Sequence, residues 1–451
     1  MNGQKYKRDI WEYFETLGLM LVLVLIATQV VAQPTVRKSD RYQRNFEELM
    51  KDPANPERSF QFAKVALEEG DLNGAISSFE RILQINPRLD NIKLELGVLY
   101  LRVGSTVLAT QYLKEAIDSP DIPNDVRNRA KRLYNIASDA SSPHTFSVRI
   151  GLGAHHDSNA NAAPSSRVVL VGGQTGLLDE NDTGQSDVSA SIQASLQYLY
   201  SFGNQEGDHL EVNLMEYSRR YDDLDEINVD ALRFDIGPRF YLGPLISAKT
   251  SFRPYLAGSL TYLDSEKYQT NGQLGVDTSY FFDEFFKTTV KLVYDEQSFY
   301  NSDDRPYSDQ RDGNGFSLDA NIDYDFTPTF SGFLGIGASS RDAEVKYESR
   351  SLQNLLAGVS YSFKPPFQLP YRWSTSLTAV LTEVDYDAPD PAVSQDETRE
   401  DSRDDIYWRT TMVFTQRYYS TIEVFKTKND STLPNYEYDN LGMNLVFWIA
   451  M

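Results

Sequence analysis

Apolar and polar residues alternate in a long series of short segments between residues 146 and 451. In residues 146–154 the even positions are apolar and the odd positions are polar or glycine, and residues 188–198 and 316–324 repeat this pattern. A period of two gives a β-strand one apolar face and one polar face. Segments of about ten residues or more, with charged residues on the polar face, predict a transmembrane β-barrel whose apolar face contacts lipid.

The connections between about fourteen such segments alternate in length, as they do in barrels that have long outer loops and short periplasmic turns. An even number of strands places both ends of the barrel on the periplasmic side. The long, mostly acidic connections are residues 155–185, 222–230, 301–314, 341–350, 385–405 and 427–436, and the connection at 264–266 is a short exception. The tight connections are residues 203–207, 243–249, 283–286, 327–329, 364–372 and 415–417.

Composition excludes several classes of function. The chain has 451 residues, no cysteine and a formal net charge of −22. The acidic charge argues against a nucleic-acid partner, because nucleic acid needs a basic surface. The absence of cysteine excludes disulfides and thiolate chemistry. A mean hydropathy of −0.45 is typical of a water-soluble protein, but a barrel gives such a value too, because half of each strand and all of the loops are polar.

Residues 1–32 have the pattern of a secretory signal peptide. Lys5, Lys7 and Arg8 form a positive front, residues 17–27 form a short apolar core, and Ala32 is a small residue suited to cleavage. The alternative is an uncleaved anchor in the inner membrane. We predict a signal peptide, because a barrel must leave the inner membrane to fold.

A helical repeat follows the signal segment. Small and apolar residues recur 34 positions further on, which is the period of a tetratricopeptide repeat. Each repeat is a pair of helices that buries its apolar face against its neighbours. Ala63, Ala66, Gly70, Ala75, Phe79 and Ile82 of the first repeat correspond to Gly97, Tyr100, Gly104, Ala109, Leu113 and Ala116 of the second, and Pro87 and Pro120 follow the two repeats.

The predicted fold is therefore an α + β chain of two domains, in which a short tetratricopeptide array precedes an antiparallel barrel of about fourteen strands. We predict a periplasmic repeat domain at residues 33–143 and an outer-membrane barrel at residues 144–451. Residues 42–50 and 125–140 are expected to cap the array. Such arrays usually present a concave surface that binds a partner, and the alternative is a helical plug or spacer without a ligand.

A specific motif follows the first predicted strand. Asp157, Asn159, Asn161, Ala163 and Pro164 form a D-x-N-x-N-x-A-P element. With the signal peptide, the repeats and the barrel, this element resembles the surface lipoprotein assembly modulator (Slam) family. The resemblance implies a translocon that delivers lipoproteins, or in some relatives secreted proteins, to the cell surface. The chain departs from the family pattern in having only two clear repeats, which bears on how it recruits a client.

The last predicted strand carries a second motif. Asn440, Gly442, Leu445 and Phe447 resemble the signal that the barrel-assembly machinery reads on a last strand, and this machinery is a predicted partner during biogenesis. Leu441, Met443 and Ile449 share the expected lipid-facing positions. The alternative is an ordinary amphipathic strand.

We predict no catalytic residue, no cofactor and no metal site. His155 and His156 are neighbours in a strand, so their side chains point to opposite faces and chelate poorly. Residues 179–184 resemble a calcium loop faintly, but Thr183 replaces a usual ligand. A barrel lipase or protease needs a nucleophile beside an oriented base, and the sequence places none beside His209.

Charged residues on the polar positions of the strands are predicted to face the barrel lumen. Two interpretations stay open: ion pairs that close the lumen, or a path for a substrate. The lumen residues are Arg149, Arg233, Asp235, Arg239, Arg253, Asp319 and Asp323, with Glu211 and Glu423 on the same parity.

Three functions fit this organisation. The first is a translocon in the outer membrane whose periplasmic repeats recruit a client lipoprotein or secreted protein. The second is an exopolysaccharide export porin with periplasmic repeats. The third is a structural barrel whose repeats only bind cell-wall or periplasmic partners. The domain order and the element at residues 157–164 favour the first.

Overall fold

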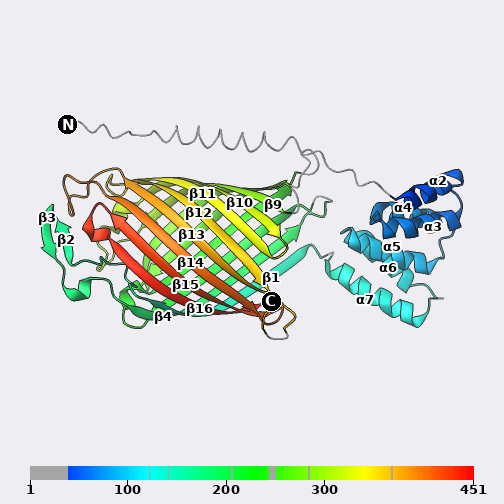
Figure 1. Ribbon diagram of the computed structural model, residues 1–451, viewed down its shortest axis with the longest axis horizontal. Helices are drawn as coiled ribbons and strands as arrows, with labels where there is room; N and C mark the ends of the chain where they lie inside the picture. Colours follow the sequence, from blue (N-terminus) through cyan, green and yellow to red (C-terminus); the bar gives the residue numbers. More distant parts are fainter. Residues whose placement is uncertain are drawn as a thin grey trace. The chain divides into compact units, whose positions relative to one another are not determined.

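The computed structural model describes residues 39–451 except 121, 141, 205–206, 243–249, 283–284 and 367–368. The chain forms two compact units that divide between Ser142 and Pro143. The first unit consists of helices and the second of strands (Figure 1). The predicted signal peptide lies outside the described residues. In the described part of the chain, no helix is both long and apolar enough to span a membrane.

The helical unit consists of antiparallel helix pairs, which confirms the predicted repeats. Asn55 caps α3 by accepting hydrogen bonds from the backbone of Glu57 and Arg58, and Asp71 caps α4. Gly70 and Gly104 have φ angles of 73° and 77° at the turn within each pair, a conformation that glycine adopts without strain. The helices are α2 (Asp40–Lys51), α3 (Pro56–Glu68), α4 (Leu72–Ile85), α5 (Asp90–Arg102), α6 (Thr106–Ile117) and α7 (Asn124–Ala140).

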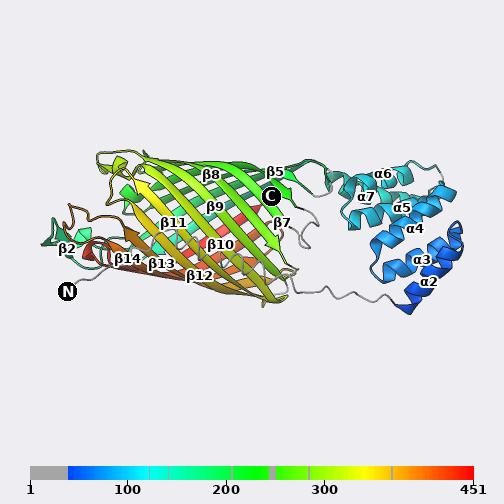
Figure 2. The ribbon, with the colours of Figure 1, turned by 90° about the horizontal axis from the view of Figure 1, so that it is seen from above.

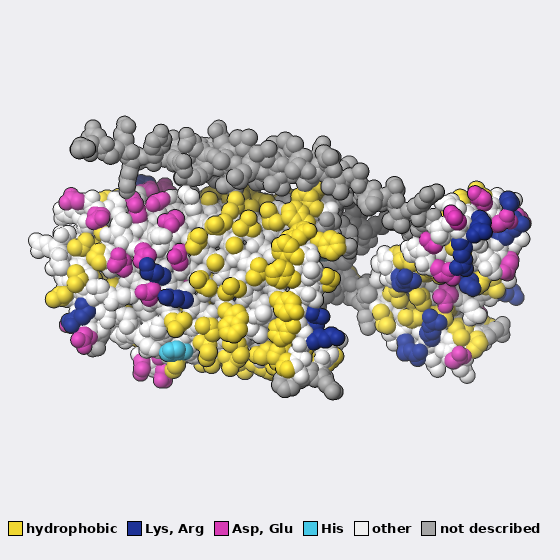
Figure 3. All heavy atoms as spheres, viewed as in Figure 1, with side chains coloured by type: hydrophobic (Ala, Val, Ile, Leu, Met, Phe, Trp, Pro, Cys, Tyr) yellow, Lys and Arg dark blue, Asp and Glu magenta, His cyan; other side chains and the backbone are white. Residues whose placement is uncertain are grey.

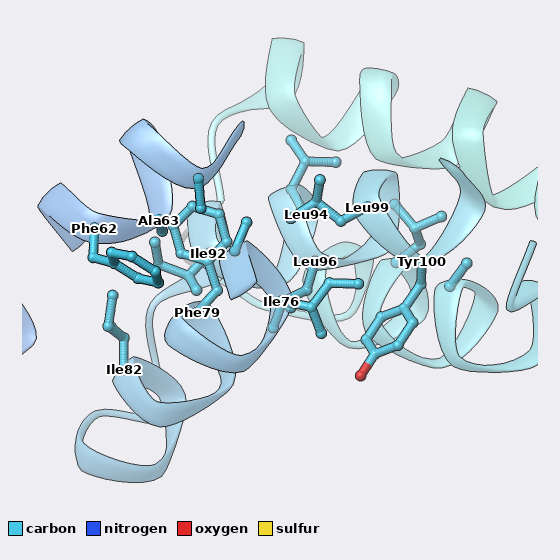
Figure 4. Close-up of a cluster of buried hydrophobic side chains, with 14 of the residues drawn as sticks. Phe62, Ala63, Ile76, Phe79, Ile82, Ile92, Leu94, Leu96, Leu99 and Tyr100 are labelled. Atoms are coloured by element: carbon cyan, nitrogen blue, oxygen red, sulfur yellow. The ribbon is translucent and has the colours of Figure 1, made fainter. Parts of the chain in front are cut away.

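The repeated small residues lie where the helices cross. Ala63, Ala75, Ala109 and Ala116 are all 0% exposed. Larger side chains, among them Phe62, Phe79, Leu96 and Tyr100, fill the space between the crossings (Figure 4). Helices α5 and α6 are in close contact at Gly97, where a Cβ atom would lie 2.5 Å from Cγ of Leu113. The period of 34 therefore reflects the packing of α5 on α6 as it does that of α3 on α4.

Substituting Gly97→Val is expected to destabilise the helical unit by about 1–3 kcal/mol, because the new side chain overlaps Leu113. The measurement is the thermal midpoint of the helical circular-dichroism signal in the full-length chain. The control is Gln111→Val on the exposed face of α6, which is expected to change stability by about 0.5 kcal/mol or less. Equal midpoints for the two variants would show that Gly97 is not at a tight crossing.

The second unit is a closed antiparallel barrel of fourteen strands, as predicted (Figures 1 and 2). A separate hairpin, β2 (Val168–Val171) and β3 (Gln174–Leu177), lies within the connection between β1 and β4. The barrel strands are β1 (His144–Asp157), β4 (Asp187–Ser201), β5 (His209–Tyr221), β6 (Val229–Tyr241), β7 (Thr250–Leu263), β8 (Glu266–Phe281), β9 (Phe286–Phe299), β10 (Gly313–Thr327), β11 (Phe330–Ala343), β12 (Arg350–Phe363), β13 (Trp373–Tyr386), β14 (Glu400–Val413), β15 (Tyr418–Ser431) and β16 (Tyr438–Ala450).

The apolar parity of the strands faces outward, as the alternation predicts. Leu152 and Ile192 are 53% and 52% exposed, and large apolar side chains of the other strands are exposed as well. They form an apolar belt on the face of the barrel that Figure 3 shows. Aromatic pairs such as Phe326–Phe330 and Phe363–Trp373 lie at the end of the tight turns. A belt with an aromatic girdle is the surface that a lipid bilayer covers, so this is a transmembrane barrel.

The strands are longer than a bilayer requires. They contain 13 to 16 residues, whereas a tilted transmembrane strand needs about 9–11. The surplus lies at the end that carries the long connections, here called the loop end; the opposite end is the turn end. Charged side chains gather beyond the apolar belt at this end (Figure 3). Arg220 and Asp230, on outward positions of β5 and β6, form one such ion pair. The barrel wall therefore extends beyond the apolar belt on that side.

Candidate functional site

The barrel closes where β1 pairs with β16, and this seam is its shortest ladder. Its nine consecutive residue pairs run from Arg149 opposite Ala450 to Asp157 opposite Gly442. By contrast, β1 and β4 share fourteen pairs, and the next shortest ladder, between β6 and β7, has ten. Two more backbone bonds of 2.9 and 2.8 Å join Val148 and Met451. The seam thus has fewer paired residues than any other barrel ladder among the described strands, and contacts between side chains add to what holds it closed.

Asp157 ties three strands together at the loop end of the seam. The residue is only 5% exposed, and its carboxylate receives a hydrogen bond from Arg219 of β5 at 2.5 Å. Its other oxygen accepts from the side-chain amide of Asn440 on β16 at 3.0 Å. Charge-assisted bonds of this kind are about twice as strong as neutral ones. The first residue of the motif therefore holds β1 against the last strand.

The remaining motif residues build the turn that follows β1. The buried amide of Asn159 donates to the carbonyls of Ala163 and Asp439 at 2.9 and 3.3 Å. Asn161 donates to the carbonyl of Thr183 at 3.2 Å. The motif thus joins β1, β16 and the segment that leads into β4. We call this set the seam clasp; it consists of Asp157, Asn159, Asn161, Ala163, Pro164, Arg219 and Asn440.

The connection beyond the clasp reaches two other loops. Gly172 and Gly173, at the tip of the β2–β3 hairpin, donate backbone hydrogen bonds to Ala392 and Val393, both at 2.8 Å. Asn435, between β15 and β16, exchanges two hydrogen bonds with the backbone of Leu170. The long connection predicted at residues 155–185 is therefore an ordered cover that crosses the seam at the loop end.

Neutral hydrogen bonds hold the lumen side of the seam below the clasp. The ring nitrogens of His155 lie 2.8 Å from Oδ1 of Asn444 and 2.7 Å from Oγ of Ser191. His156 points outward, so the two histidines diverge as predicted. The indole of Trp448 lies over Gly151, where a Cβ atom would come within 2.9 Å of the ring. A glycine in β1 therefore makes room for the large side chain of β16.

Substituting Asp157→Ala is expected to loosen the loop end of the seam, because it leaves Arg219 buried without its carboxylate. Backbone amides in residues 153–158 and 441–446 should exchange hydrogen about ten- to a hundredfold faster, which corresponds to about 1.4–2.8 kcal/mol of lost local stability. The measurement is hydrogen exchange of the full chain in lipid nanodiscs.

The matched control is Asp401→Ala on β14, whose carboxylate is also buried and paired with an arginine, Arg399, at 2.6 Å. This variant is expected to leave exchange at the seam unchanged. If both variants changed the seam equally, Asp157 would have no special part in closing it.

A second cluster of charges lies on the inner wall of β5 to β8. Arg253 is 4% exposed, and its guanidinium contacts Glu211 at 3.4 Å, Asp277 at 3.5 Å and Asp235. Arg239 also binds Glu211, at 3.1 Å. Glu211 and Arg253 belong to strands that are not neighbours, and their side chains meet only on the concave side of the barrel wall. The alternate strand positions to which Glu211 and Arg253 belong therefore face the lumen.

The predicted lumen residues all fall on this inner parity but differ in their surroundings. Asp235, Arg239 and Arg253 belong to the cluster just described. Asp319 of β10 lies in register with Lys291 of β9 and lines the cavities described next, and Arg233 lines one of them. Arg149 and Asp323 lie nearer the turn end. The pairing partners Glu211 and Glu423 share the parity, and Glu423 binds Arg409 at 2.5 Å.

Two adjoining cavities open along the inner wall. The larger has a volume of about 520 Å³, and the smaller has a volume of about 360 Å³. Lys291 and Asp319 line both of them. Gln273, Gln297 and Asn354 add amide groups, and Leu356 and Val380 add an aliphatic edge on β12 and β13. Some of the predicted lumen charges thus form ion pairs with the same wall, and others line open space.

Polar contacts in the helical unit join one helix to another. The hydroxyl of Tyr42 donates to Asp71 at 2.5 Å, and burial together with this bond raises the pKa of Tyr42 to about 12. Tyr100 donates to Glu80 at 2.5 Å, and burial and the Glu80 carboxylate raise its pKa in the same direction. Both phenols therefore stay neutral at physiological pH and act as donors between helices.

Sequence reasoning missed several of these residues. Arg219 and Ser191 lie in other strands, far from the motif in sequence.

Across the described ranges, no three histidine, aspartate or glutamate side chains gather in a way that could hold a metal ion.

The comparisons with known proteins give distant similarities of fold. No protein-family model matches the chain, and no curated protein matches it. A bacterial polysaccharide outer-membrane secretin matches over 67% of this chain and 98% of its own, with 8% identity and a TM-score of 0.34. An anion-selective porin from Comamonas acidovorans matches over 68% and 99%, with 9% identity and a TM-score of 0.35.

The helical unit has a similar counterpart in MamA. The match covers 22% of this chain and 52% of MamA, about half its length, with 15% identity and a TM-score of 0.19. At such identities and TM-scores, these similarities carry no inference about what this chain binds or transports.

Proposed function

We propose that the chain is an outer-membrane translocon that delivers lipoproteins or secreted proteins to the cell surface. The observation that carries the proposal is the seam clasp. The element that resembles the Slam family lies at the junction of the first and last strands, and its buried residues hold that junction. A repeat array and a transmembrane barrel in one chain supply the two parts such a translocon needs.

Each part then has a defined role. The helical unit lies in the periplasm and recruits the client, since stacked helix pairs present an extended surface for peptides. The barrel provides the path across the outer membrane, and its lipid belt anchors it there. The barrel-assembly machinery inserts it by reading Asn440, Gly442, Leu445 and Phe447 on β16.

The test compares a deletion strain with its parent and with a complemented strain. Intact cells are shaved with protease, and the released peptides are identified by mass spectrometry. The proposal expects one or a few proteins to vanish from the surface while remaining in the periplasm, and to return on complementation. An unchanged set of surface proteins would refute it.

Export of an exopolysaccharide is the second candidate, and the cations of the lumen favour it. However, Arg239 and Arg253 are already neutralised by carboxylates of the same wall. The same deletion strain separates the two functions: loss of surface glycan with an intact set of surface proteins would establish the second.

A further inference from the structure

We infer that the two lumen cavities form a binding site for an acidic, extended polypeptide segment. The inference rests on the proposed function, because it names the chemistry of the client that the lumen accepts. It depends on three observations: more cations than carboxylates in the lining, polar groups suited to a peptide backbone, and an aliphatic edge in the same cavity as Lys291.

Two cations lining the cavities form no ion pair within the described residues. Arg253, Arg239 and Arg341 are each bound to carboxylates. Lys291 and Arg233 form no ion pair among the residues that the structure describes, although Lys291 stands opposite Asp277 and Asp319 of the neighbouring strands. Lys291 instead lies 5.9 Å from the ring centroid of Tyr255. Because the wall around them lowers the local dielectric, these cations attract anions more strongly than surface cations do.

Arg341 lines the smaller cavity. One of its terminal nitrogens binds Asp295 at 2.9 Å. The other, Nη1, is buried and has no hydrogen-bond partner among the described residues. A buried donor without a partner is destabilising, and this nitrogen can reach a ligand oxygen only if the side chain turns toward the cavity. The linings of the two cavities together contain four cations, Arg233, Arg239, Lys291 and Arg341, against three carboxylates, Asp277, Asp295 and Asp319.

The rest of the lining favours a polypeptide over a glycan. Gln273, Gln297 and Asn354 can donate to and accept from a peptide backbone. Leu356 and Val380 line the same cavity as Lys291. An extended peptide places alternate side chains on opposite sides, so acidic residues can face Lys291 while apolar ones face this edge. Neither lining includes an aromatic ring on which a sugar could stack.

The test measures current block in planar bilayers that contain the purified full-length chain. The probe is an acetylated, amidated peptide of sequence Glu-Val-Glu-Val-Glu-Val, and its control carries Gln in place of Glu. The acidic peptide is expected to block the current at a concentration at least about tenfold lower than the Gln peptide, as expected for charge-assisted hydrogen bonds.

The variant K291Q/R233Q is expected to remove this difference, and the single variant K291Q to reduce it. Neither cation is in an ion pair, so both variants should keep the heat-modifiable mobility of a folded barrel. The matched control is K426Q/K428Q, which removes two outward-facing charges of β15 and should leave the block unchanged.

Four results would overturn the inference. The first three are absence of any current through the folded chain, equal block by the two peptides, and undiminished block of the current in K291Q. The fourth is equal block by an oligogalacturonate with three carboxylates, because the site would then bind polyanions in general. All readouts use purified protein. A negative result here together with missing surface proteins in the deletion strain would reject the site and keep the translocon.

Discussion

A chain that lacks residues 40–140 is expected to insert a folded barrel and to deliver no client to the cell surface. The barrel closes on itself through β1 and β16, and every hydrogen bond of the clasp lies within the second unit. The barrel should therefore assemble without the helices. The proposed recruitment of the client, in contrast, depends on the helical unit alone.

Two measurements on the same cells test this prediction. Heat-modifiable mobility in gel electrophoresis reports the folded barrel, and protease shaving reports the client at the surface. The expected result is wild-type mobility with delivery reduced to the level of the full deletion. A matched control is the full-length chain with Gln111→Val, which should deliver normally. Normal delivery by the truncated chain would show that the helices do not recruit.

Substituting Arg253→Met is expected to have the largest effect on the barrel itself. The buried guanidinium neutralises Glu211, Asp235 and Asp277. Removing one partner of a buried ion pair typically costs about 3–5 kcal/mol, because it leaves uncompensated charge in a poorly hydrated site. Three carboxylates facing one another at this point should lower the yield of heat-modifiable barrel and its thermal midpoint in detergent.

Two further variants separate charge from packing. The control is Arg149→Met, the same substitution at an exposed position that also faces the lumen. It is expected to change the stability of the barrel by about 0.5 kcal/mol or less. Combining Arg253→Met with Glu211→Gln, Asp235→Asn and Asp277→Asn removes the repulsion and should restore much of the barrel yield. A barrel that tolerates Arg253→Met alone would show that these carboxylates are solvated rather than held by Arg253.

The sequence alone reveals the parity of the barrel and the period of the helices, and both are local properties. Alternation along one strand assigns Arg253 to the inner face, and the spacing of Ala63 and Gly97 assigns helix crossings. Neither pattern contains the register between strands. The approach of Arg219 to Asp157, or of Asn444 to His155, depends on which residues stand opposite each other after closure.

Residues of the predicted assembly signal also make structural contacts that the sequence alone does not reveal. Asn440 and Gly442 match the predicted assembly signal, and that role remains a prediction. The structure places Asn440 in the clasp and places Gly442 beneath the ring of Phe425. The hairpin of β2 and β3 was hidden inside a predicted loop, because strands of four residues are too short for alternation to identify.

The most direct test of a protein path is a photo-crosslinker placed inside the lumen of the working barrel. Asn354 lines the larger cavity, and a benzoylphenylalanine at this position should trap a passing client in living cells. The expected product is a larger species that contains peptides of one of the proteins lost from the surface in the deletion strain. The same probe at Leu355, which faces lipid, should trap no client. A product at position 354 that contains glycan and no foreign peptide, or no product from cells that are displaying their surface proteins, would contradict the account.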